Sequence, residues 1–186
     1  MKIKQEVFYL ALTILLCLKC NFRDSIEPKS LNQVCVLNET KKLNYSLDSS
    51  YKERFSDFTD KTYNILTLHN ENDRIYVTIE IFDMETNSEM MNVHTFQENL
   101  FLPKNEIISS LVNDEISYLK NIKFKDNSRV KSIILKDDKV NVIKILTQYK
   151  IDNYRINILT LSNEKHNDVN SLEEKISPFL NSIYIK

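Results

Sequence analysis

Polar and apolar residues alternate in segments of the chain between residues 43 and 83, and a period of two is typical of β-strands with one buried face. In the longest such segment the residues of the apolar face are Ile75, Val77, Ile79 and Ile81. Asn70-Glu71-Asn72-Asp73 lies before that segment and has the composition of a hairpin turn. The strands predicted in this part of the chain are 43–47, 63–69 and 74–83.

The spacing changes after Pro103, where apolar residues recur at steps of three and four. That spacing places them along one side of an α-helix. The residues of this stripe are Ile107, Ile108, Leu111, Val112, Ile116, Leu119 and Ile122. We expect one helix of about five turns that crosses from the first strands to the next ones and covers a face of their sheet.

Three further alternating segments follow, separated by short turns rich in Asp. Asp residues tolerate the left-handed backbone conformations of tight hairpin turns. The predicted strands of this meander are 130–136, 140–151 and 154–161, with turns at 137–139 and 152–153. The last amphipathic pattern predicts a second helix from Ser171, with Asn170 as its N-cap. Pro178 lies inside this pattern, so the helix is expected to kink or split there.

A chain of 186 residues has room for one domain and a targeting segment, against about 100–200 residues for a typical domain. The predicted fold class is α+β: an antiparallel sheet of about five to six strands, with the crossover helix and the C-terminal helix packed on it. The predicted parts of the chain are a signal peptide over 1–19, a tether over 20–42 and a single domain over 43–186.

This order of elements is similar to that of the Mog1/PsbP-like superfamily, which has a strand hairpin, a crossover helix, a three-stranded meander and a closing helix. The C-terminal stretch Ile176-Ser-Pro-Phe-Leu-Asn-Ser182-Ile-Tyr-Ile resembles the Ile-x-x-x-x-x-Ser-like end of those domains. The resemblance covers about residues 50–186. It implies a binding or assembly role without catalysis, and it carries over no functional residue.

The N-terminus begins with Lys2 and Lys4, followed by an uncharged run over 7–18. A basic start before a short apolar run is typical of a secretory signal, and this run is shorter than the ~20 residues of a membrane span. Cys20, followed by Asn, ends the region in a way that resembles bacterial lipoprotein signals. The resemblance implies that Cys20 carries a diacylglyceryl group, which would anchor the exported chain to a membrane.

The cysteines leave alternatives open. Lys19 stands where lipoprotein signals have a small residue, so processing at Cys17 and an unmodified chain are alternatives to lipidation at Cys20. Without lipidation, a disulfide between Cys20 and Cys35 is the competing use of these thiols in an oxidising compartment. Otherwise Cys35, between two valines, is expected to be a small buried residue and not a nucleophile.

Composition and charge exclude several classes of protein. The chain has no glycine, so it holds no glycine-dependent phosphate loop of the Rossmann or Walker type. Its formal net charge is −1, and removing residues 1–19, which carry three lysines and one glutamate, leaves −3. This balance indicates no nucleic-acid partner.

The densest polar cluster lies between the first strands and the crossover helix, and its residues are Asp83, Glu85, Glu89, His94 and Glu98. A hydrolase that used this segment would hold His94 within hydrogen-bonding distance of two carboxylates. A solvated loop explains the same residues without catalysis. The segment 69–73 lacks the twelve-residue pattern of a calcium loop, so a hairpin turn is expected there. We expect no catalytic residue, cofactor or metal site.

The sequence therefore favours an exported, lipid-anchored binding or assembly protein of the bacterial cell envelope, which faces the periplasm or the cell exterior. The expected partner is another protein, held on a sheet or helix face. The alternatives are an envelope hydrolase that uses the segment 83–98 and an immunity or protection protein.

Overall fold

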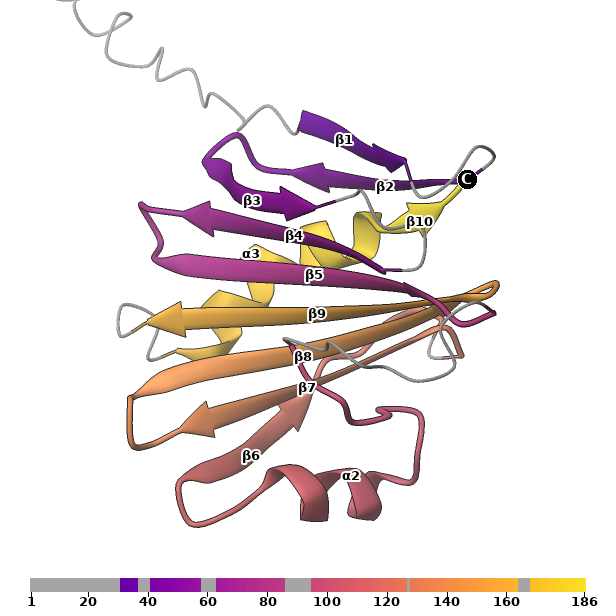
Figure 1. Ribbon diagram of the computed structural model, residues 1–186. Coiled ribbons are helices and arrows are strands. Elements are labelled where there is room, and N and C mark those ends of the chain that lie inside the picture. The colour runs from indigo at the N-terminus through magenta and orange to yellow at the C-terminus, as the bar shows by residue number, and fades with distance from the viewer. Residues whose placement is uncertain (1–30, 37–40, 58–62, 86–94, 127, 164–167) are drawn as a thin grey trace, which may run out of the picture.

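The computed structural model describes residues 31–36, 41–57, 63–85, 95–126, 128–163 and 168–186. A seven-stranded antiparallel sheet forms its centre (Figure 1). In spatial order the strands are β3 (Tyr51–Asp57), β4 (Tyr63–Asn70), β5 (Ile75–Asp83), β9 (Tyr154–Asn163), β8 (Val142–Ile151), β7 (Val130–Asp137) and β6 (Ile116–Asn121). The α+β class and the antiparallel sheet are as predicted, although five to six strands were expected.

Two helices and a smaller sheet complete the described part of the chain. The helices are α2 (Lys104–Leu111) and α3 (Val169–Ser182), and the strands of the small sheet are β1 (Leu31–Val36), β2 (Lys42–Leu47) and β10 (Tyr184–Ile185). Figure 1 shows α3 behind the large sheet and α2 beside its β6 edge. Residues 31–36 of the predicted tether form β1, which pairs with β2 along its whole length.

The two faces of the large sheet are covered differently. The helix face packs against α3 and carries Ile79 of β5 beside its register partner Ile158 of β9. Both side chains are 0% exposed and share a buried cluster with Leu172 and Ile176 of α3. Because burying one such side chain contributes about 1.5–3 kcal/mol, this layer holds α3 on the sheet.

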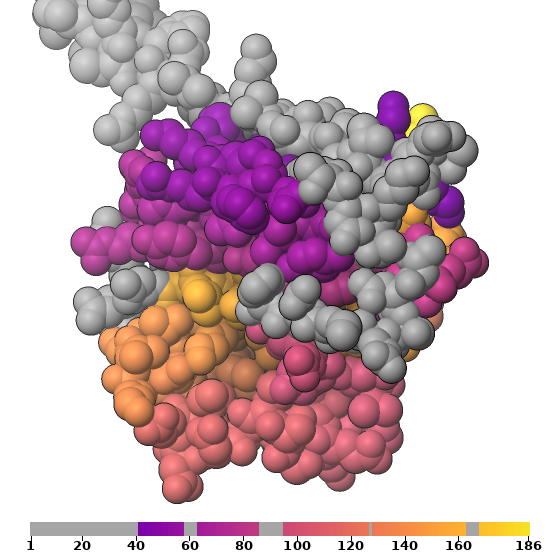
Figure 2. All heavy atoms as spheres, in the orientation of Figure 1, coloured from indigo at the N-terminus to yellow at the C-terminus, as the bar shows by residue number. Residues whose placement is uncertain are grey.

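The opposite face, named the strap face here, is covered by an irregular segment and by α2. We call residues 95–101 the strap. Figure 2 views the molecule from this side and shows α2 and the segment before it, in pink, over its lower part. Phe96 and Leu100 of the strap and Ile107 of α2 form a second buried cluster with residues of β7 and β8.

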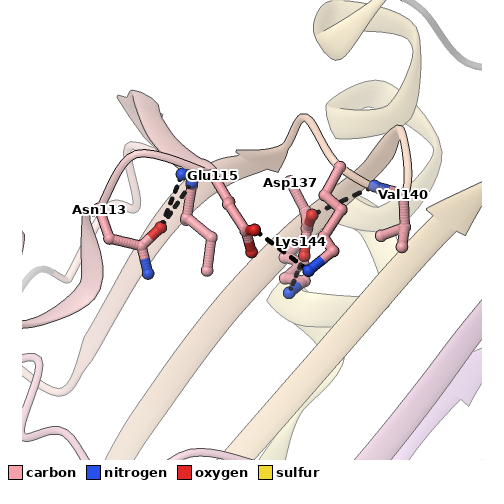
Figure 3. A network of polar contacts seen from close by, with 7 residues as sticks. Asn113, Glu115, Asp137, Val140 and Lys144 are labelled. Carbon is pink, nitrogen blue, oxygen red and sulfur yellow. Dashed lines mark hydrogen bonds and ion pairs between the residues drawn. The ribbon is translucent and has the colours of Figure 1, made fainter.

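The crossover helix is much shorter than predicted. α2 ends at Leu111, and the residues after 115 form β6 alongside β7. Between them, the side-chain oxygen of Asn113 accepts hydrogen bonds from the backbone N–H groups of Glu115 and Ile116, both at 2.9 Å (Figure 3). An Asn that bonds to the backbone two and three residues later favours a turn over a helix. The predicted five-turn helix is therefore wrong.

A β-bulge in β6 produces the helix-like spacing of its apolar residues. The pairing with β7 shifts between Tyr118 and Lys120, so Leu119 is an extra residue. An extra residue turns the side chains that follow it to the other face of the sheet. Tyr118 accordingly packs in the cluster of the strap face, whereas Ile122 belongs to the cluster of the helix face.

The C-terminal helix begins earlier than predicted and is not split. α3 begins at Val169, and its N-cap is Asp168, whose carboxylate accepts a hydrogen bond from the backbone N–H of Asn170 at 3.0 Å. The prediction that Asn170 is the cap was wrong. Pro178 lies on the exposed side of a helix that continues to Ser182. Tertiary packing of the buried side therefore outweighs the lost backbone hydrogen bond.

The predicted hairpin turns at 70–73, 137–139 and 152–153 are confirmed by the pairing of the strands on either side. In each of these hairpins one residue has a positive φ: 53° at Arg74, 50° at Asn141 and 51° at Asp152. Asn and Asp tolerate this backbone region, whereas for other residues it costs about 1–2 kcal/mol. A chain without glycine thus closes its hairpins with polar residues.

Candidate functional site

The predicted lipidation site, Cys20, and the alternative site, Cys17, are both outside the described residues. Cys35 lies in β1, where its register partner is Leu43 of β2. Among the helices that the structure describes, none is long and apolar enough to cross a membrane. Lipidation of Cys20 and the alternative disulfide with Cys35 both stay predictions.

The predicted polar cluster is described only in part, since His94 and Glu89 are outside the described residues. The carboxylate of Asp83, at the end of β5, accepts a hydrogen bond from the backbone N–H of Glu85 at 3.0 Å. Glu98 takes part in the strap through its backbone carbonyl. Within the described ranges, no group of three or more His, Cys, Asp or Glu side chains is arranged to hold a metal ion.

His69 lies in a packed position at the end of β4. Its ring stacks on that of Tyr76, with centroids 4.0 Å apart and planes 10° from parallel. Arg54 on β3 lies 3.2 Å from the Nδ1 atom of His69 and forms an ion pair with Glu71 at 2.7 Å. These contacts close the β4–β5 hairpin, and they agree with the predicted turn at 69–73.

Buried polar side chains hold the strap to the sheet. Asn157, which is fully buried, donates a hydrogen bond to the carbonyl of Phe96 at 2.9 Å and accepts one from the side chain of Gln148 at 2.9 Å. Arg155 donates to the carbonyls of the next two strap residues at 3.0 and 2.8 Å. The bonds from Asn157 and Arg155 to the strap all end on its backbone carbonyls, so they fix the path of the strap.

A cleft of about 680 Å³ lies at one end of the helix face, between the β6–β7 loop and the end of α3. Its size is within the range of small-molecule sites, roughly 300–1,000 Å³. The apolar residues that line it are Phe124, Val130, Ile151, Leu180, Ile183 and Ile185. Segments from three distant parts of the sequence therefore build one apolar floor.

The rim of this cleft is basic because of an alternation in the residues after β6. Ile122 and Phe124 are 5% and 8% exposed and belong to the core, whereas Lys123 and Lys125 are exposed and line the cleft. The bulge at Leu119 sets which residues of this alternation face inward. Because both lysines line the same cleft, both can contact a ligand bound there.

One carboxylate, that of Asp126, also lines the cleft. It accepts a hydrogen bond from the backbone N–H of Ser128 at 3.0 Å and lies 3.5 Å from Nε of Arg129. The hydroxyl of Ser128, followed by the charge of Arg129, holds the pKa of Asp126 below its usual value. Lys123 and Lys125 form no ion pair with any residue that the structure describes. The rim thus keeps an excess of positive charge.

The inner wall of the cleft is fixed by contacts to the last turn of α3. The hydroxyl of Tyr149 on β8 donates a hydrogen bond to the carbonyl of Leu180, and burial raises the pKa of this hydroxyl. Ser182 accepts a hydrogen bond from the backbone N–H of Ser46 at 2.7 Å. At Ile183 the backbone becomes extended and leads into β10. These contacts hold the end of α3 against both sheets.

A second cleft, of about 610 Å³, lies beside α2 on the other side of the same hairpin. Four lysines line it: Lys104, Lys120, Lys123 and Lys131. Lys120 forms an ion pair with Glu173 of α3 at 2.5 Å, and Lys104 lies 4.7 Å above the ring of Tyr118. Lys123 lines both clefts, so the two clefts adjoin at this residue of the β6–β7 loop.

Comparison with known proteins gives no further assignment: no protein-family model and no curated protein matches the chain.

Sequence reasoning missed the basic hairpin because it considered the charge of the whole chain. Residues 120–131 contain five cations and one carboxylate, whereas the chain as a whole has a net charge of −1. Counting charge segment by segment would have found this stretch. No local pattern in the sequence predicts the cleft itself, because its floor includes residues from β8 and from the end of α3.

Proposed function

We propose that this chain is an exported, lipid-anchored binding protein of the bacterial cell envelope, and that its ligand occupies the cleft between the β6–β7 loop and the end of α3. The binding role is supported by the cleft of about 680 Å³, with its apolar floor and basic rim. Export and anchoring are supported by the basic start, the short apolar run over 7–18 and Cys20.

We also propose that the domain is Mog1/PsbP-like. The proposal is supported by the order of the described elements: the β4–β5 hairpin, the crossover through α2, the β7-β8-β9 meander and the closing helix α3. Resemblance to that superfamily implies that this chain has a binding role without catalysis.

The expected protein partner on a sheet or helix face stays a prediction. The geometry favours a smaller ligand, because the cleft is concave and has a few charged groups at its rim. A protein partner would need a buried interface of about 800 Å² on each side, which exceeds a single cleft of this kind.

Substitution of the proposed anchor residue tests export and lipidation. The full chain, expressed in its own cells, is expected in the membrane fraction with a diacylglyceryl group at Cys20. Cys20→Ser is expected to remove the lipid and to move the protein out of the membrane fraction. Cys17→Ser is the matched control, and it is expected to leave both properties unchanged.

Intact mass decides between the outcomes. A wild-type chain without lipid, or a Cys20→Ser chain that still carries one, would contradict the anchor at Cys20. Loss of the lipid in Cys17→Ser alone would assign the modification to that residue.

A further inference from the structure

We propose that the cleft binds a single-chain anionic amphiphile of the fatty-acid class, with its carboxylate at Lys123 and Lys125 and its hydrocarbon chain along Leu180, Ile183 and Ile185. This inference rests on the proposed function and deepens it, since it names the class of ligand.

The charge of the rim selects the head group. Lys123 and Lys125 are exposed and both line the cleft, and neither has an ion-pair partner among the described residues. The carboxylate of Asp126, which would repel an anion, is engaged by Arg129 and Ser128. A ligand carboxylate between the two lysines would form charge-assisted hydrogen bonds, which are stronger than neutral ones.

The floor of the cleft selects the rest of the ligand. Leu180, Ile183 and Ile185 line the cleft, and Ile185 is half-buried, so this part of the wall presents hydrocarbon to a ligand. The end of α3 carries the partial negative charge of a helix C-terminus, which disfavours a carboxylate there. The carbonyl of Leu180 already accepts the hydroxyl of Tyr149. Both features place the hydrocarbon tail of the ligand against α3 and its carboxylate at the β6–β7 loop.

The shape of the site favours a single molecule over a membrane surface. The cleft is a concave volume of about 680 Å³ whose floor lies among buried core residues. A bilayer surface would contact exposed lysines anywhere on the hairpin, but it would leave this floor empty. We therefore assign the cleft to a monomeric amphiphile. A protein that binds anionic bilayers but no monomeric amphiphile would count against the assignment.

Photo-crosslinking of the full chain tests the inference. The protein, taken from its own cells into nanodiscs of phosphatidylcholine, is exposed to a diazirine analogue of laurate, and the crosslinked residues are mapped by mass spectrometry. We expect labelling within residues 180–185 that excess laurate displaces, whereas excess dodecanol of the same chain length does so poorly. Lys123→Glu combined with Lys125→Glu is expected to weaken the apparent affinity by at least about tenfold.

Lys52→Glu is the matched control, because Lys52 is an exposed lysine on β3 that lines neither cleft. It is expected to leave labelling unchanged. Equal displacement by dodecanol, equal loss in Lys52→Glu, or labelling confined to other residues would overturn the head-group assignment. Binding of the chain to phosphatidylglycerol vesicles without displaceable labelling would do the same. None of these results would alter the mass or the membrane location that test the proposed function.

Discussion

At the scale of single residues, Asp137 illustrates how charge closes a turn. Its carboxylate accepts a hydrogen bond from Lys144 at 2.6 Å and another from the backbone N–H of Val140 at 3.3 Å (Figure 3). The Lys144 ammonium, together with that N–H group, holds the pKa of Asp137 below its usual value. The ionised carboxylate therefore stabilises the fold at neutral pH.

Asp137→Asn is expected to lower the free energy of unfolding at pH 7. A carboxylate with a lowered folded-state pKa contributes its full stability above the unfolded pKa of about 3.9, and this contribution is lost as the pH falls through the folded pKa. The difference between wild type and variant should therefore shrink as the pH falls below about 4. Urea unfolding at pH 7 and in acid measures both values. A difference that is independent of pH would refute this role of the ion pair.

Asn157 is a second residue whose role can be measured. Asn157→Leu would leave the carbonyl of Phe96 and the amide of Gln148 buried without this partner. We expect a loss of about 2–4 kcal/mol in the free energy of unfolding, since each buried unsatisfied group costs about 1–3 kcal/mol. Hydrogen exchange should also speed up in the strap. The exposed Asn105→Leu on α2 is the control, with an expected change within about 0.5 kcal/mol, and equal effects of the two substitutions would contradict this role of Asn157.

At the scale of elements, the sequence predicts those strands whose two sides differ in polarity. β5 and the β7-β8-β9 meander alternate clearly, and the predicted hairpins between them are present. β3 was not predicted, because it is an edge strand whose side chains are nearly all exposed, so its residues show no alternation. Its pairing with β4 decides its conformation. β6 was mistaken for helix because the bulge at Leu119 gives a strand the spacing of a helix.

Deletion of Leu119 tests the bulge. Without the extra residue, one half of β6 must present its side chains to the wrong face of the sheet. If Ile122 and Phe124 leave the core, the free energy of unfolding should fall by roughly 4 kcal/mol or more. Leu119→Ala keeps the bulge and shortens a side chain that is 37% exposed, so it should cost less than about 1 kcal/mol. Thermal unfolding compares the two variants, and a deletion as mild as the substitution would contradict the role of the bulge.

At the scale of the whole molecule, the candidate site depends on contacts between distant parts of the sequence. The lysines of its rim come from the β6–β7 loop, whereas its floor includes residues of β8 and of the segment 180–185. The basic stretch 120–131 is visible in the sequence, but the apolar floor beside it is not. Periodicity predicts which face of an element is buried, and it does not predict which elements leave a cleft between them.

The most direct test of the anchored binding role is native mass spectrometry of the full chain extracted from its own cells. We expect a chain that begins at Cys20, carries a diacylglyceryl group and retains a small anionic amphiphile. We also expect that Lys123→Glu with Lys125→Glu loses the amphiphile and keeps the lipid anchor. A chain that begins at residue 1 without lipid would contradict the proposed anchor, and retention of the same ligand in wild type and in the double variant would contradict the proposed site.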